Sequence, residues 1–125
     1  MKVIAMSTSE TVHRFNEAFR RHDPSAFVDL VAPDCVMETI QPAPDGTRYE
    51  GYEPNLAFWQ ALAADRSSRF EVEDTLVMGE RATVRWRLRF GEEESLRGVS
   101  LMRVREGRII EALAYTKVAG EPAPL

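Results

Sequence analysis

Residues 82–90, with the sequence ATVRWRLRF, decide the fold. Large apolar and basic residues alternate along this stretch, so an extended chain places them on opposite sides. One side carries Val84, Trp86, Leu88 and Phe90, and the other carries Thr83, Arg85, Arg87 and Arg89. Alternation with a period of two is typical of a β-strand with one buried face. We therefore expect Trp86 to face an interior that other segments cover, and the arginines to face outward.

Length and composition predict a single domain, residues 1–125, with a core at about 9–118. A chain of 125 residues with 44% hydrophobic side chains can bury one core without disulfides. The net charge of −4 disfavours nucleic acid, because phosphate binding relies on a basic surface. Cys35 is the single cysteine, which favours a reducing, cytoplasmic location. No apolar run is long enough to cross a membrane, so we expect no membrane partner.

Three helical segments are predicted before the strand-rich half of the chain. The first begins at a capping box in residues 7–10 and ends near His22. The second is a short amphipathic helix over about residues 24–31, with proline in its first turn. The third runs from Pro54 to about Asp65 and has a broad apolar face. A helix with such a face is expected to lie across a sheet.

The other segments are predicted to be strands and turns. Residues 35–40 form a short strand, and the proline- and glycine-rich residues 41–51 form a loop or an irregular hairpin. Strands follow at residues 69–77, 95–105 and 109–117, separated by glycine-containing turns.

Parity assigns the two faces of this sheet. If Trp86 points inward, hairpin pairing also brings inward Leu96, Gly98, Ser100, Met102, Ile110, Ala112, Ala114 and Thr116. Several of these residues are small and leave room for a cavity. The opposite face carries an apolar cluster within a charged surround: Val99, Leu101, Leu113 and Tyr115. We interpret this cluster as a homodimer interface, the alternative being that long arginine stems cover it.

Three phrases of the chain together resemble one superfamily. They are FNEAFRRHDPSAFVDLVAPDCVMET (15–39), RYEGYEPNLAFWQAL (48–62) and LMRVREGRIIEALAYTKV (101–118). Their order and spacing resemble the nuclear transport factor 2-like superfamily, which includes ketosteroid isomerases, SnoaL-like polyketide cyclases, scytalone dehydratase and limonene epoxide hydrolase. The resemblance implies an α+β fold: a cone-shaped, curved antiparallel or mixed sheet wrapped around three N-terminal helices, with an internal pocket. It does not fix an activity.

The catalytic residues of ketosteroid isomerases are altered in this sequence. The resemblance aligns their donor tyrosine with Phe15, their carboxylate base with Thr39 and their donor aspartate with Ser100. Phe15 cannot donate a hydrogen bond and Thr39 cannot act as a carboxylate base, so we expect no ketosteroid isomerase activity. The inner positions of residues 96–104 hold no charge, so the acid-and-arginine set of the epoxide hydrolases is also unmatched.

One carboxylate, Glu38, lies next to Thr39. It would face inward only if its strand bulges or if the assigned register is off by one, and otherwise alternation turns it into solvent. Glu38, Thr39 and Ser100 are therefore the candidate catalytic residues, for a proton transfer in an isomerisation, cyclisation or dehydration. The two histidines lack a metal-ligand spacing, and we expect no metal or cofactor.

Apolar residues dominate the expected pocket and predict a small, mostly apolar ligand that is cyclic or polyketide-like. Its expected walls are Phe15, Met37, Phe58, Trp59, Trp86 and Met102. Thr39, Ser100 and Thr116 would orient the ligand, and Tyr49 would contact it from the mouth. The alternative is a non-catalytic, dimerising scaffold whose own side chains fill the cone.

Overall fold

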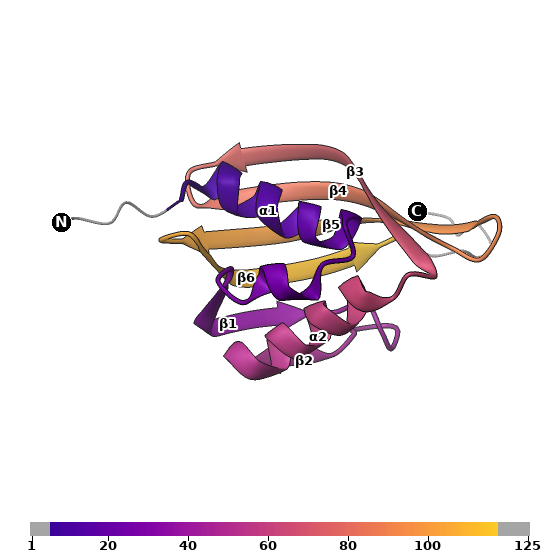
Figure 1. Ribbon diagram of the computed structural model, residues 1–125, viewed down its shortest axis with the longest axis horizontal. Coiled ribbons are helices and arrows are strands. Elements are labelled where there is room, and N and C mark those ends of the chain that lie inside the picture. Colours follow the sequence, from indigo (N-terminus) through magenta and orange to yellow (C-terminus); the bar gives the residue numbers. More distant parts are fainter. Residues whose placement is uncertain (1–5, 118–125) are drawn as a thin grey trace, which may run out of the picture.

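The computed structural model describes residues 6–117 and shows a curved sheet that covers two α-helices (Figure 1). The elements in chain order are α1 (Thr8–Arg20), the 3-10 turn η1 (Pro24–Phe27), β1 (Val31–Glu38), β2 (Arg48–Glu50), α2 (Tyr52–Ala64), β3 (Ser68–Met78), β4 (Arg81–Phe90), β5 (Glu94–Arg105) and β6 (Arg108–Thr116). This arrangement confirms the α+β class. Residue 118, the predicted end of the core, lies outside the described residues, as do both ends of the predicted domain.

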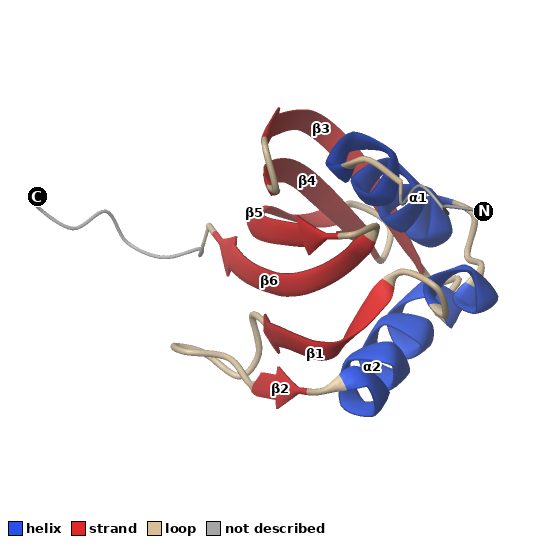
Figure 2. Ribbon diagram, turned by 90° about the vertical axis from the view of Figure 1, so that its left-hand side faces the viewer, coloured by secondary structure: helices blue, strands red, loops and turns tan. Residues whose placement is uncertain are grey.

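The sheet is mixed, and its strand order is β2-β1-β6-β5-β4-β3. Strands β1 and β6 pair in parallel, and every other neighbouring pair is antiparallel. Both helices lie on the same side of the sheet, with α2 beside β1 and α1 nearer β3 and β4 (Figure 2). The sheet and the helices therefore enclose a common interior.

The start of α1 follows directly from the capping box. Ser7 is the N-cap, and its hydroxyl accepts a hydrogen bond of 3.1 Å from the backbone N–H of Glu10. The helix then buries one stripe that includes Val12, Phe15 and Phe19. This stripe faces the interior and supplies part of its aromatic lining.

The second predicted helix is wrong in extent, because it is one 3-10 turn of four residues. The chain enters β1 at Val31, four residues before the predicted strand. The cause is non-local: the backbone N–H of Ile109 donates to Leu30 O at 2.7 Å, and Val31 already pairs with Ile109. The Leu30 carbonyl, which a longer helix would need as a hydrogen-bond acceptor, is therefore already bonded to β6.

The proline- and glycine-rich residues 41–51, predicted as a loop or an irregular hairpin, form an irregular hairpin. Its return strand β2 pairs antiparallel with β1 and leads into α2 through Gly51, which has φ 93°. Helix α2 begins at Tyr52, so Pro54 lies in its first turn. Proline is tolerated there because the backbone N–H groups of the first turn have no acceptor within the helix. The buried Asn55 amide donates to Cys35 O at 3.0 Å and Gly51 O at 2.7 Å, which fixes the helix to the hairpin.

The core is densest where η1 enters the sheet. Phe27, Val31 and Ile109 are fully buried there. Cys35 is also fully buried, and burial raises the pKa of its thiol to about 12. The thiol therefore stays protonated, and Cys35 packs as a small buried hydrophobic residue.

The two faces of β4 are as the alternation predicts. Trp86 is 6% exposed and faces the interior. Arg89 pairs with Glu71 on the outer side at 2.6 Å, and Arg97 of β5 pairs with Glu73 at 3.0 Å. No helix among residues 6–117 has the length and apolar character needed to cross a membrane.

Candidate functional site

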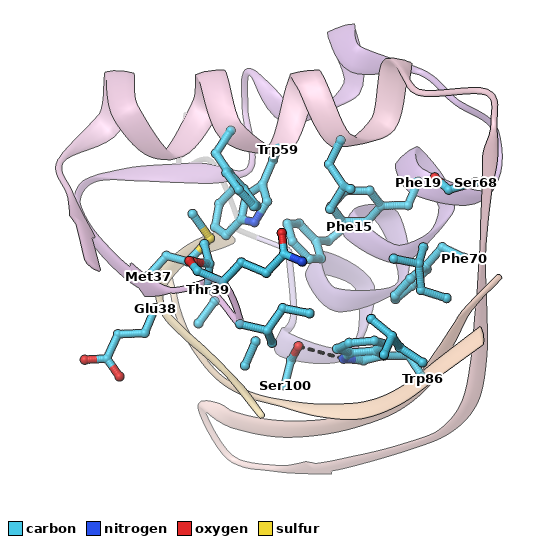
Figure 3. Close-up of a pocket in the computed structure, with 18 of the residues that line it drawn as sticks. Phe15, Phe19, Met37, Glu38, Thr39, Trp59, Ser68, Phe70, Trp86 and Ser100 are labelled. Carbon is cyan, nitrogen blue, oxygen red and sulfur yellow. Dashed lines mark hydrogen bonds between the residues drawn. The ribbon is translucent and has the colours of Figure 1, made fainter. Parts of the chain in front are cut away.

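A cavity of about 540 Å³ lies between the two helices and the inner face of the sheet (Figure 3). Aromatic and sulfur-containing side chains form a large part of its walls. These residues are Phe15, Phe19, Met37, Tyr49, Phe58, Trp59, Phe70, Trp86, Phe90 and Met102. On the β6 side the lining consists of Ala112 and Ala114, whose small side chains leave the volume open.

Trp86 is placed by the glycine opposite it. Trp86 pairs with Gly98 in the β4–β5 register, and a Cβ on Gly98 would lie 2.6 Å from two ring carbons of Trp86. The glycine thus lets the indole lie flat against β5. In this position the indole Nε1–H donates to Ser100 Oγ at 3.0 Å (Figure 3).

This contact orients the hydroxyl of Ser100 in the pocket. Because Ser100 Oγ accepts from the indole, its own O–H can donate to a ligand. The indole N–H, in contrast, is already occupied. A carbonyl or ether oxygen on a ligand is the matching partner for Ser100.

Thr39 lines the pocket, but its hydroxyl serves the neighbouring loop. Thr39 Oγ1 donates to Gln41 O at 2.9 Å and accepts from the Thr47 backbone N–H at 3.1 Å. These bonds hold the rim loop onto the end of β1. The Thr39 side chain therefore forms part of the cavity wall, and its hydroxyl is already used in hydrogen bonds to the loop.

The structure turns the Glu38 carboxylate away from the pocket, which corrects its nomination as the pocket acid (Figure 3). Met37 and Thr39 lie on the inner side of β1, so Glu38 between them faces outward. The irregularity in β1 lies between Val31 and Val36 and does not alter this alternation. On the outer side Arg48 Nη1 donates to Glu38 Oε2 at 3.2 Å.

The remaining predicted ligand-binding residues divide into two groups. Most line the cavity: Phe15, Met37, Tyr49, Phe58, Trp59, Trp86, Ser100 and Met102. Thr116 does not line it, because it pairs with Gly98 beyond the two β6 alanines that face the hollow. The structure thus assembles one site from residues far apart in sequence, while their ligand contacts stay predictions.

Several lining residues were missed from the sequence. Phe19 and Leu62 belong to the helical faces, and Phe70 pairs with Leu88 in the β3–β4 register. That pairing could have identified Phe70, although β3 alternates weakly. Asp65 also lines the cavity and follows the last residue of α2.

Asp65 is held in a tight turn. Its Oδ1 accepts from the backbone N–H of Ser67 at 2.9 Å and from Ser67 Oγ at 2.5 Å. These hydrogen bonds lower the pKa of Asp65 below the usual value of an aspartate, with a smaller contribution from His22. The Asp-x-Ser sequence directly after the predicted helix was the available signal.

The charges around the cavity are of one sign. The described lining residues include the carboxylates Glu38 and Asp65, and none of them is a lysine, arginine or histidine. Within residues 6–117, no three His, Cys, Asp or Glu side chains cluster closely enough to hold a metal ion. The pocket therefore presents hydroxyl groups, aromatic faces and negative charge to whatever enters it.

Comparisons with known proteins agree with this architecture. The model of the SnoaL-like domain family matches residues 12–112. No curated protein matches the chain. A crystal structure of a nuclear transport factor 2-like protein of unknown function from Mesorhizobium loti is 44% identical, with a TM-score of 0.86, and the match covers 94% of this chain and 97% of that chain.

Two more distant structures share the fold. A candidate ketosteroid isomerase from Kribbella flavida is 23% identical, with a TM-score of 0.78 and coverage of 98% of this chain and 87% of that chain. A candidate polyketide cyclase from Pseudomonas putida is 22% identical, with a TM-score of 0.69 and coverage of 90% and 93%. At these identities the likeness demonstrates the common fold alone.

Proposed function

Because the chain belongs to the SnoaL-like domain family of the nuclear transport factor 2-like superfamily, we propose that it binds a small, mostly apolar, cyclic or polyketide-like molecule in its cone. The observation that carries this proposal is the cavity of about 540 Å³ with many aromatic side chains in its walls and the oriented hydroxyl of Ser100. Sites for small molecules combine such apolar walls with a few placed polar groups. A cone filled by its own side chains, as the scaffold alternative requires, would leave no such volume.

Catalysis by proton transfer is a second proposed role, and Ser100 is the residue that favours it. Its hydroxyl can donate to a carbonyl oxygen on which negative charge develops during isomerisation, cyclisation or dehydration. Glu38 cannot serve as the base from its outward position. Ligand binding is therefore the primary role that we propose, and catalysis is the secondary one.

Binding can be tested by thermal shift and calorimetry with cyclic ketones and aromatic polyketides. Ligands that fit should raise the melting temperature, because they bind only the folded state. Ser100→Ala should weaken the binding of ketones by about three- to tenfold, the typical effect of one hydrogen bond. Ser95→Ala is the matched control, since Ser95 is an exposed serine of the same strand.

Two results would contradict the proposal. One is a melting temperature that no compound of the panel changes. The other is an equal loss of affinity in Ser95→Ala and Ser100→Ala, which would remove the assigned role of the pocket serine.

We also propose that two copies of the chain associate through the outer face of β5 and β6. Val99 pairs with Tyr115 and Leu101 with Leu113, so the four apolar side chains form one contiguous cluster. Leu101 is 41% and Tyr115 54% exposed in the single chain. Symmetric pairing of two copies would bury this cluster, and exposed apolar clusters of this kind are typical of protein–protein interfaces.

Light scattering after size exclusion tests this association. Leu101→Glu should convert a dimer to a monomer, because it places like charges close together across a symmetric interface. Val28→Glu is the control, as Val28 is 45% exposed and lies outside this cluster. A monomeric native protein would refute the proposed interface.

A further inference from the structure

We propose that Asp65 determines the specificity of this pocket by accepting a hydrogen bond from a donor group at the outer end of the ligand. The pocket would then select neutral or cationic molecules and reject carboxylates. This inference rests on the proposed binding function and adds to it the polar pattern of the ligand.

The first argument is the charge of the lining. Glu38 and Asp65 are its charged residues, and the Glu38 carboxylate is turned outward onto Arg48. An anionic ligand would find no lysine, arginine or histidine among the described lining residues. Its charge would enter an apolar cavity without a partner, which is strongly unfavourable.

The second argument is the geometry of Asp65. One carboxylate oxygen, Oδ1, is committed to Ser67, which fixes the orientation of the side chain. The other oxygen, Oδ2, has no hydrogen-bond partner within residues 6–117. Asp65 is an exposed residue of the cavity lining, and we therefore assign this acceptor to the rim of the cavity.

The groups around Asp65 keep it ionised near neutral pH. The hydrogen bonds from Ser67 lower its pKa, and His22 acts in the same direction. His22 itself is held by a contact of 2.9 Å between its Nδ1 and Ala63 O at the end of α2. Asp65 therefore presents an anionic acceptor to molecules entering the pocket.

Together the two polar points define a ligand pattern. Ser100 on β5 donates, so the inner end of the ligand carries an acceptor such as a ketone oxygen. Asp65 accepts, so the outer end carries a donor such as a hydroxyl or ammonium group. The rings between them contact apolar walls that include Trp86 and Phe70.

Four bicyclic ketones separate these effects: 2-tetralone and its 6-hydroxy, 6-methoxy and 6-carboxy derivatives. They share one ring system and one ketone, and they differ only in the outer group. Affinities measured by calorimetry should rank the hydroxyl compound above the methoxy compound, and the carboxylate should bind weakest. Quenching of tryptophan fluorescence gives an independent measurement, because Trp59 and Trp86 both line the cavity.

Asp65→Asn tests the residue itself, because its amide oxygen can still accept from Ser67. We expect binding of the hydroxyl compound to weaken about five- to tenfold, as for loss of a charged hydrogen-bond partner. Binding of the methoxy compound should not change, and the carboxylate should bind more tightly.

Asp23→Asn is the matched control. Asp23 forms the same Asp-x-Ser turn, accepting from Ser25 N–H at 3.1 Å and Ser25 Oγ at 2.6 Å, and it does not line the cavity. This variant should leave all four affinities unchanged. Ser67→Ala keeps the charge and the backbone hydrogen bond to Asp65 but removes the hydrogen bond from Ser67 Oγ, so it should reduce the preference for the hydroxyl compound by a smaller factor.

The outcomes distinguish this inference from the function on which it rests. Equal affinity of the native protein for the hydroxyl and methoxy compounds would overturn the role of Asp65 and leave pocket binding intact. An equal loss for both compounds in Asp65→Asn would assign Asp65 a structural role and overturn the inference as well. Failure of all four tetralones to bind the native protein would overturn the inference and count against the binding function.

Discussion

The central strands β4, β5 and β6 build two different environments along one inner face. At the packed end, near η1, Val104 and Ile109 are at most 2% exposed. At the hollow end, the same strands continue through Ser100 and Ala114, which line the cavity. The difference between these ends shows how one alternating pattern can supply both a core and a binding site.

Side-chain size accounts for much of the difference. At the packed end the ring of Phe27 lies 5.5 Å from that of Phe15 and 4.8 Å from that of Phe19, and these two rings also form part of the cavity wall. At the hollow end β5 and β6 offer glycine, serine and alanine to the interior. The missing volume lowers the number of packing contacts, and it provides room for a ligand.

The largest contrast between the two ends should come from removing one ring at each. Phe27→Ala at the packed end should lower the free energy of unfolding by about 3–5 kcal/mol, because it leaves a cavity in a filled core. Phe90→Ala at the hollow end should cost only about 1 kcal/mol, because Phe90 is half-buried beside an existing cavity. Urea denaturation of both variants provides the measurement. Similar losses would show that the ends are equally packed.

Enlarging an alanine should reduce stability at the packed end and ligand binding at the hollow end. Ala18→Leu at the packed end should destabilise the fold by about 1–3 kcal/mol, since Ala18 is 2% exposed and has no space beside it. Ala114→Leu should fill part of the cavity, change the melting temperature little, and weaken ligand binding at least about tenfold. Retained binding by Ala114→Leu would place the ligand outside this cavity.

Gly98→Ala should disturb the hollow end, where Trp86 lines the cavity. The added Cβ would lie 2.6 Å from the Trp86 ring and 2.6 Å from the backbone oxygen of Tyr115, so both the indole and the β6 backbone must move. We expect a loss of about 1–2 kcal/mol, because the strain is partly offset by the lower chain entropy of alanine in the unfolded state. In a Trp59→Phe background, a shift of Trp86 fluorescence would report the broken bond to Ser100. An unchanged spectrum would contradict the assigned role of Gly98.

The sequence predicts the faces of this sheet better than it predicts the volume that they enclose. The alternation around Trp86 depends only on the local backbone period, so its inward orientation follows from the residues themselves. The end of the second helix depends on Leu30 bonding to β6, which local patterns do not contain. The volume of the cavity depends on the distance of α1 and α2 from the sheet, which local patterns do not give. For the same reason the sequence does not show that Asp65 belongs to the cavity lining. Thr116 was misplaced for the same reason, because parity gives its face but not how far the hollow extends.

The smallest effect is expected outside both ends, at Glu38. Glu38→Gln removes the charge that faces Arg48 on the outer side of β1, where water and Glu50 remain available to the guanidinium. The melting temperature and the affinity for cyclic ketones should therefore stay within experimental error of the native values. Thr39→Ala, one residue further along, provides the contrast, because it removes the hydroxyl that holds the rim loop and should lower the melting temperature. A clear loss of binding or turnover in Glu38→Gln would show that this carboxylate reaches the ligand, and the division between pocket and outer face at β1 would have to be redrawn.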